Sequence, residues 1–153
     1  MTFARNNTLL VTSYNEHCVQ RIHLHDLAID DYCGKCGKPG WLNNGVHRTE
    51  VRLHWPVGVT YDRVSKIYIS EKRDLIHVDE SNNELVSVVP QAPDDLRIGY
   101  MAYDLIGETF LFRYYKTHNG STVDNTDTEV FIEGVFEGIA SSAAVRWAAA
   151  QVN

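Results

Sequence analysis

The feature that most constrains this chain is a strand–turn–strand pattern that recurs along its 153 residues. Copies of the pattern begin near residues 9, 56 and 98, and each joins two alternating apolar segments through a polar turn. A repeat of this kind decides the fold, because repeated units stack on their neighbours to bury a shared core. Alternation with little helical periodicity favours an all-β chain.

The second copy carries the clearest motif. It opens with the pattern Pro-x-Gly-hydrophobic-x-x-Asp, which falls on Pro56, Gly58, Val59 and Asp62. A strand of the Leu-Tyr-Val type follows at 67–69.

The other copies match in part. The first has a Leu-Leu-Val strand at 9–11, a turn with Asn and His at 15–17, and a strand of the Ile-Arg type at 19–22. The third lacks the opening Pro and has Leu-Arg-Ile at 96–98 instead. These motifs resemble the NHL repeat, a β-propeller blade of about four short strands.

The resemblance implies an all-β fold of NHL-type β-propeller blades, forming an incomplete propeller with a short C-terminal helix. The spacing between Asp62 and Asp104 is 104 − 62 = 42 residues, which suits a blade. We expect one domain, 1–153, with blade-like units at about 8–36, 55–90 and 96–138 and a helical tail at 141–152. The first unit is expected to begin at its second strand. The expected strands are 8–13, 17–24, 28–33, 56–62, 66–71, 75–80, 84–89, 98–104, 108–115 and 128–136. The alternative is a small β-sandwich, since short alternating strands with turns also describe that fold.

The number of units creates a packing problem. Propellers need about four to eight blades, and fewer than three are expected here. The missing blades would come from a longer polypeptide, from copies of the chain or from other proteins; otherwise the chain is a small capped domain. We therefore expect protein partners or self-association. The aromatic residues expected at the interface are Phe110, Phe112, Tyr114, Tyr115 and Trp147.

Charge and hydropathy exclude several classes of protein. The formal net charge is −6 and no basic cluster is present, which argues against a nucleic-acid partner. No apolar segment reaches the length of a membrane span, and no signal peptide is visible at the N-terminus.

Three cysteines offer alternative roles. The Cys-Gly-Lys-Cys-Gly segment at 33–37 resembles the blade ends of extracellular invertebrate NHL proteins, which carry a cysteine pair. A disulfide between Cys18 and Cys36 would join neighbouring strands and leave Cys33 for intermolecular pairing. Free buried thiols, or a metal site that uses the Cys-x-x-Cys spacing of Cys33 and Cys36, are the alternatives.

Two glycosylation motifs agree with an extracellular or secreted protein. Asn6-Asn7-Thr8 and Asn119-Gly120-Ser121 both match the acceptor pattern and fall in expected loops. A disulfide would also imply an oxidising compartment.

Catalysis receives little support, and no cofactor is expected. The sequence has no Gly-x-Ser-x-Gly elbow, no His-Glu-x-x-His motif and no phosphate-binding loop. Because some NHL-like propellers are metal enzymes, His23, His25 and His54 are alternative ligands in a propeller hydrolase or lyase. The leading hypothesis is a non-enzymatic extracellular module for protein binding or structural assembly.

Overall fold

In a computed structural model, residues 1–40, 45–61, 66–71, 74–80, 84–87, 96–104, 109–118, 121–122 and 131–135 are described. These residues form strands, turns and loops, with no helix among them. The strands are β1 (Thr2–Ala4), β2 (Thr8–Ser13), β3 (Cys18–His23), β4 (Ile29–Cys33), β5 (Pro56–Tyr61), β6 (Lys66–Glu71), β7 (Asp74–Asp79), β8 (Glu84–Ser87), β9 (Leu96–Asp104), β10 (Thr109–His118), β11 (Ser121–Thr122) and β12 (Phe131–Val135).

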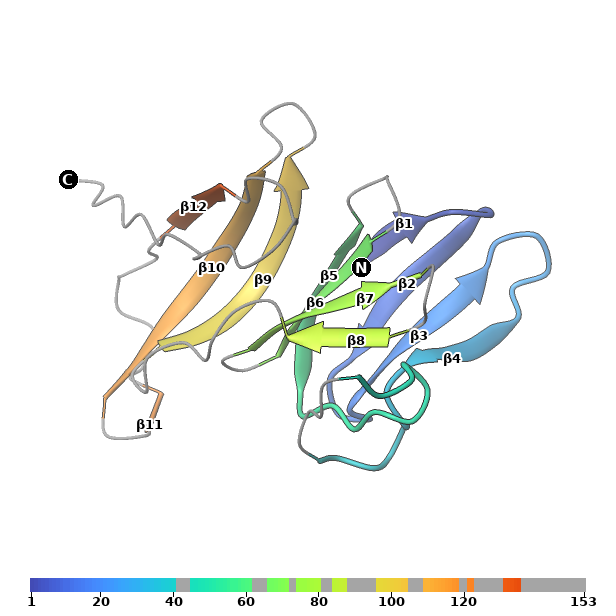
Figure 1. The fold of residues 1–153 in the computed structure, drawn as a ribbon, viewed down its shortest axis with the longest axis horizontal. Helices are drawn as coiled ribbons and strands as arrows, with labels where there is room; N and C mark the ends of the chain where they lie inside the picture. Colours follow the sequence, from blue (N-terminus) through green and yellow to red (C-terminus); the bar gives the residue numbers. More distant parts are fainter. Residues whose placement is uncertain are drawn as a thin grey trace.

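The strands form three antiparallel sheets, each from consecutive segments of the chain (Figure 1). The first sheet has the order β1-β2-β3-β4 and the second β5-β6-β7-β8. In the third, β9 and β12 flank β10, and β11 pairs with the end of β10. The all-β prediction is confirmed for the described residues, whereas the expected helix at 141–152 lies outside them.

Two strands were not predicted, β1 and the two-residue β11. The first unit is expected to begin at its second strand, but β1 pairs with β2 and gives the first sheet a fourth strand. The pairing is only three residues long, from Thr2 with Leu10 to Ala4 with Thr8. A segment this short, Thr-Phe-Ala, carries too little alternation to be recognised.

The first two sheets pack face to face around the main core. The first sheet contributes Leu10, Val19 and Tyr32. The second sheet contributes alternate residues of three strands, all on the face that it turns toward the first sheet. These second-sheet residues are Val59, Tyr61, Ile67, Ile69, Ile76 and Val78. Alternation along each strand explains this set, because side chains two apart share a face. The linking segment after β4 adds Val51 and Leu53, both almost fully buried, so it packs into the core as well as connecting the sheets.

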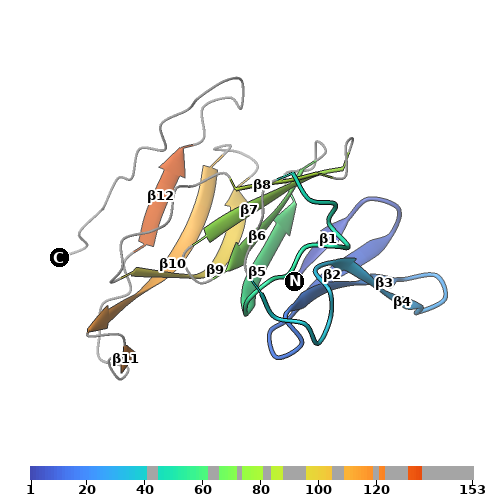
Figure 2. The ribbon, with the colours of Figure 1, turned by 60° about the horizontal axis from the view of Figure 1, so that its bottom comes forward.

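The third sheet lies on the other face of the second. Strand β9 runs beside β5 and β6 (Figure 2). The contact is close at Gly58, where a Cβ atom would lie 3.1 Å from the backbone nitrogen of Met101 on β9. The same atom would lie 2.7 Å from Oγ of Ser70 on the neighbouring strand β6. The glycine of the Pro-x-Gly motif therefore sits where two sheets approach closely, which is a position that favours glycine.

Candidate binding surfaces

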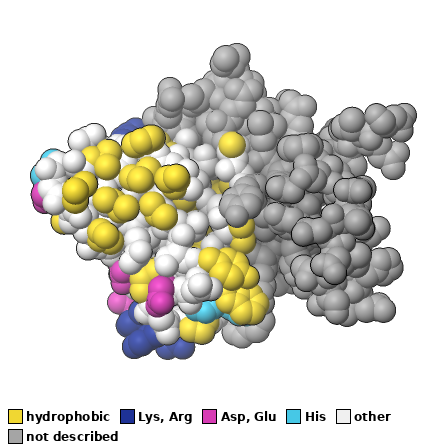
Figure 3. All heavy atoms as spheres, turned by 180° about the vertical axis from the view of Figure 1, so that it is seen from behind, with side chains coloured by type: hydrophobic (Ala, Val, Ile, Leu, Met, Phe, Trp, Pro, Cys, Tyr) yellow, Lys and Arg dark blue, Asp and Glu magenta, His cyan; other side chains and the backbone are white. Residues whose placement is uncertain are grey.

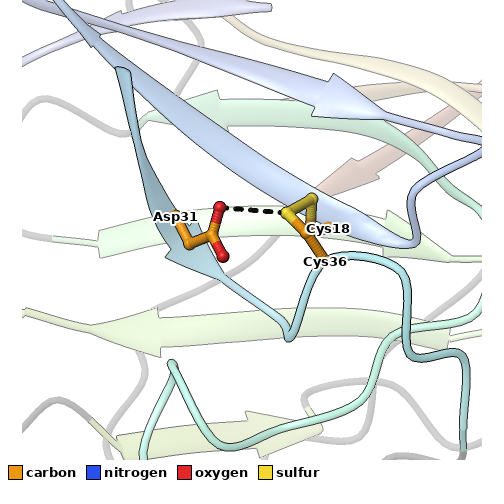
Figure 4. The surroundings of a disulfide bond; sticks show 3 residues. All are labelled: Cys18, Asp31 and Cys36. Carbon is orange, nitrogen blue, oxygen red and sulfur yellow. Dashed lines mark hydrogen bonds between the residues drawn. A yellow bond between two sulfur atoms is a disulfide. The ribbon is translucent and has the colours of Figure 1, made fainter. Parts of the chain in front are cut away.

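The cysteines form the covalent link that the sequence analysis favours. Cys18 at the start of β3 and Cys36 in the loop after β4 are joined by a disulfide, with their Cα atoms 5.1 Å apart (Figure 4). The bond fixes this loop across one end of the first sheet. It also removes Cys36 from the alternative metal site, because a sulfur in a disulfide is not a thiolate ligand.

A carboxylate lies against this disulfide. Oδ1 of Asp31 is 3.0 Å from Sγ of Cys36, and Asp31 is exposed (Figure 4). A disulfide sulfur carries no hydrogen, so this contact is not a hydrogen bond donated by a thiol. Were the disulfide reduced, Cys18, Asp31 and Cys36 would offer three ligand atoms within 4.8 Å of one another.

The third cysteine is isolated in the core. Cys33 is fully buried, and burial in apolar surroundings raises the pKa of its thiol. Its sulfur cannot reach another molecule in this conformation, which speaks against the intermolecular pairing suggested by the odd number of cysteines.

An aromatic platform lies next to the disulfide loop. It consists of Tyr14 and His17 from the β2–β3 turn and His54 and Trp55 from the segment before β5. The rings of His54 and Trp55 stack with centroids 4.2 Å apart, and Tyr14 stacks on Trp55 at 6.0 Å. The backbone N–H of Trp55 donates to Nδ1 of His17.

The backbone of this platform is unusual. His17 and Trp55 both have positive φ, at 57° and 59°, although neither is glycine. Such conformations are rare for bulky residues and gather at binding and catalytic sites, where the surrounding structure holds them. With Tyr14 and Trp55 exposed, the platform offers stacked rings to a ligand or partner.

A second surface is the outer face of the first sheet, which carries a row of apolar side chains. The row crosses all four strands in register, from Phe3 through Leu9 and Ile22 to Ile29. Phe3 is 71% exposed and Ile29 is 61% exposed. Figure 3 shows hydrophobic side chains gathered over this part of the molecule. Leu9 and Ile22 between them are half-buried. A contiguous apolar row that is exposed at both ends is typical of an interaction site.

A polar pocket of about 280 Å³ lies between the first two sheets. Its charged groups already have hydrogen-bond partners: Arg21 binds Asp30 through two nitrogens, Arg5 donates to Oη of Tyr61, and Tyr32 donates to Glu80. These contacts hold the pocket together. Because both signs of charge line it, the pocket is a poor anion site.

The histidines proposed as metal ligands do not converge. His23 and His25 are neighbours, with ring centroids 5.9 Å apart, but Nε2 of His23 faces Asp30 and Nε2 of His25 faces Asp26. His54 belongs to the aromatic platform near the opposite end of β3. Among the residues that the structure describes, no candidate metal cluster contains a histidine.

The remaining predicted sites are located only in part. Asn6 is exposed in the β1–β2 turn, as an acceptor site requires, whereas Asn119 and Trp147 lie outside the described residues. Phe110, Phe112, Tyr114 and Tyr115 lie on β10, the strand between β9 and β12. Phe110 and Phe112 pair with Tyr103 and Met101, whereas Tyr114 and Tyr115 follow a register shift.

The aromatic platform was missed by sequence reasoning. Tyr14 and Trp55 are 41 positions apart, and only the packing of the two loops brings them together. The Trp-Pro pair at the start of β5 gave no signal of it, because the residue before Pro is expected to be extended, whereas Trp55 has a φ of 59°.

No family model matches this chain, and no curated protein matches it. Within the part of the chain that the structure describes, no helix has the length and apolar character to cross a membrane.

Proposed function

We propose that this chain is a non-enzymatic, extracellular module for protein binding or structural assembly, built of NHL-type propeller blades. The observation that carries the proposal is the exposed apolar row on the outer face of the first sheet, Phe3 to Ile29. An assembly module needs such a face, because the free energy gained by burying it drives association.

The arrangement of the sheets supports the propeller assignment. Each of the first two sheets is a meander of four strands, and strands β1, β5 and β9, which open the three sheets, lie next to one another in turn. Blades of a propeller stack in this way around a central axis. The disulfide and the exposed Asn6 support an extracellular location, since disulfides persist in oxidising compartments.

The mass of the native particle tests this proposal. We expect light scattering to give a defined particle larger than the 17.4 kDa chain at micromolar concentration. A particle that stays at 17.4 kDa up to millimolar concentration would overturn the assembly role and favour a stand-alone β domain. Metal analysis of the same sample tests the hydrolase or lyase alternative, which requires stoichiometric bound metal.

A further inference from the structure

The first two sheets have equivalent positions, and these can be compared row by row. In the first sheet Phe3, Leu9, Ile22 and Ile29 are paired in order across β1 to β4. In the second sheet Tyr61, Ile67, Val78 and Leu85 are paired in the same order across β5 to β8. The two rows therefore occupy the same place in their sheets.

The row in the second sheet is covered by another sheet. Tyr61, Ile67 and Val78 belong to the core, with exposures of 9%, 0% and 0%, and they pack with Leu10 and Val19 of the first sheet. Leu10 faces away from the row of its own sheet, because it is adjacent to Leu9 on the strand. Within this chain, therefore, a row of this type packs against the preceding sheet, on the face that points away from that sheet's own row.

The third sheet has such an opposite face. Leu10 lies between Leu9 and Val11, and the corresponding position in β10 is Leu111, between Phe110 and Phe112. Leu111 pairs with Ala102, which is exposed, whereas its neighbour Met101 is half-buried near Gly58. The face of the third sheet that contains Ala102 is thus the one directed away from the second sheet.

We infer that the outer face of the first sheet binds the third sheet of a second copy of this chain, and that two copies close into a ring of six sheets. Three sheets in each of two copies give six, within the four to eight that closed propellers have. The contact joins unlike faces, and such a contact closes only if its rotation completes a ring. Because each copy supplies half of the six sheets, a two-fold rotation closes this ring and the contact is made twice. This inference rests on the proposed function and names the partner of the same surface.

The test compares exposed substitutions on three surfaces. Phe3→Lys and Ile29→Lys place a charge in the row, and Ala102→Lys places one on the matching face of the third sheet. Tyr14→Lys puts the same charge on the aromatic platform, the competing candidate surface. Asn15→Lys is the control, because it puts that charge on an exposed side chain of the β2–β3 turn that belongs to none of these surfaces. All five side chains are exposed in the single chain, so we expect the variants to fold, as circular dichroism would check.

We expect the wild-type chain to have twice the mass of 17.4 kDa and the control Asn15→Lys to match it. Phe3→Lys, Ile29→Lys and Ala102→Lys should each raise the dissociation constant at least about tenfold, as charges buried in an interface do. Loss of dimer in the row variants alone would overturn the head-to-tail contact. An oligomer that only Tyr14→Lys disrupts would overturn the inference and leave the assembly role standing, while a wild-type monomer would overturn both.

Discussion

Phe3 in β1 and Tyr61 in β5 hold the same register position in their sheets, yet Phe3 is 71% exposed and Tyr61 is 9% exposed. The difference does not come from the strands, because both residues pair with the strand that follows in the same way. It comes from the neighbouring sheet, which covers Tyr61 and leaves Phe3 open. The row in the first sheet therefore occupies the position that is core in the second sheet, but no sheet of the same chain covers it.

The close contact at Gly58 predicts a strong effect of a single methyl group. Gly58→Ala should lower the free energy of unfolding by about 1–3 kcal/mol, because overpacking a tight contact forces backbone or side-chain shifts. Oγ of Ser70 and the backbone nitrogen of Met101 leave no room for the added carbon. Urea unfolding of the purified variant measures the loss.

A double variant shows whether the loss has this cause. Ser70→Ala removes the nearest atom, so Gly58→Ala should cost less in the Ser70→Ala background than in the wild type. The cost should stay above zero, because the Met101 nitrogen remains. Strictly additive effects would mean that the methyl group is accommodated away from Oγ of Ser70 and that this contact does not set the cost.

The sequence was sufficient to locate most strands, because their alternation is local. The motif at 56–62 and the apolar strand at 67–69 predicted β5 and β6 with nearly the observed bounds. It did not predict the aromatic platform or which face of a sheet is covered. Those depend on contacts between residues far apart in the chain, such as Tyr14 with Trp55, which no local pattern contains.

The disulfide could be predicted from the sequence because it, too, depends on local structure. Cys18 and Cys36 lie on adjacent structural segments, so the hairpin topology brings them together. The burial of Cys33 could not be predicted in this way, because it depends on Val51 and Leu53, which pack into the core from the linking segment.

Loss of the disulfide should destabilise the chain. Cys36→Ser should lower the free energy of unfolding by about 3 kcal/mol, since the cross-link closes a loop between residues 18 apart and restricts the unfolded chain. Urea unfolding with and without reductant measures this. Reductant should lower the stability of the wild type to a similar value and leave Cys36→Ser unchanged; equal stability of oxidised wild type and Cys36→Ser would contradict the expectation.

Stability should fall in acid partly through the Arg21–Asp30 pair. The hydrogen bonds from Arg21, with a smaller contribution from His23, lower the pKa of Asp30 below its usual value. A lowered pKa in the folded state means that the carboxylate stabilises the fold above its unfolded pKa, near 4, and that this contribution disappears as pH falls through the folded pKa.

Asp30→Asn should therefore lower stability at neutral pH and flatten its decline below about pH 4. The side chain of Asp30 is 43% exposed, so solvent screening limits the loss to under about 1 kcal/mol. Asp31→Asn is the control, because it removes the same charge from the adjacent residue and keeps the Arg21 pair. Equal acid profiles for Asp30→Asn and the wild type would show that the pair contributes nothing measurable.

The buried thiol of Cys33 gives the last prediction. With Cys18 and Cys36 oxidised, Cys33 is the only free thiol among the three cysteines, and its burial raises the thiol pKa. Because the thiolate is the reactive form, a thiol reagent at mildly alkaline pH should label the native protein only as fast as it opens. In denaturing urea it should label one thiol per chain at once. Rapid labelling without urea, or a reductant-sensitive covalent dimer on a denaturing gel, would show that Cys33 is accessible and would restore its role as a link between chains.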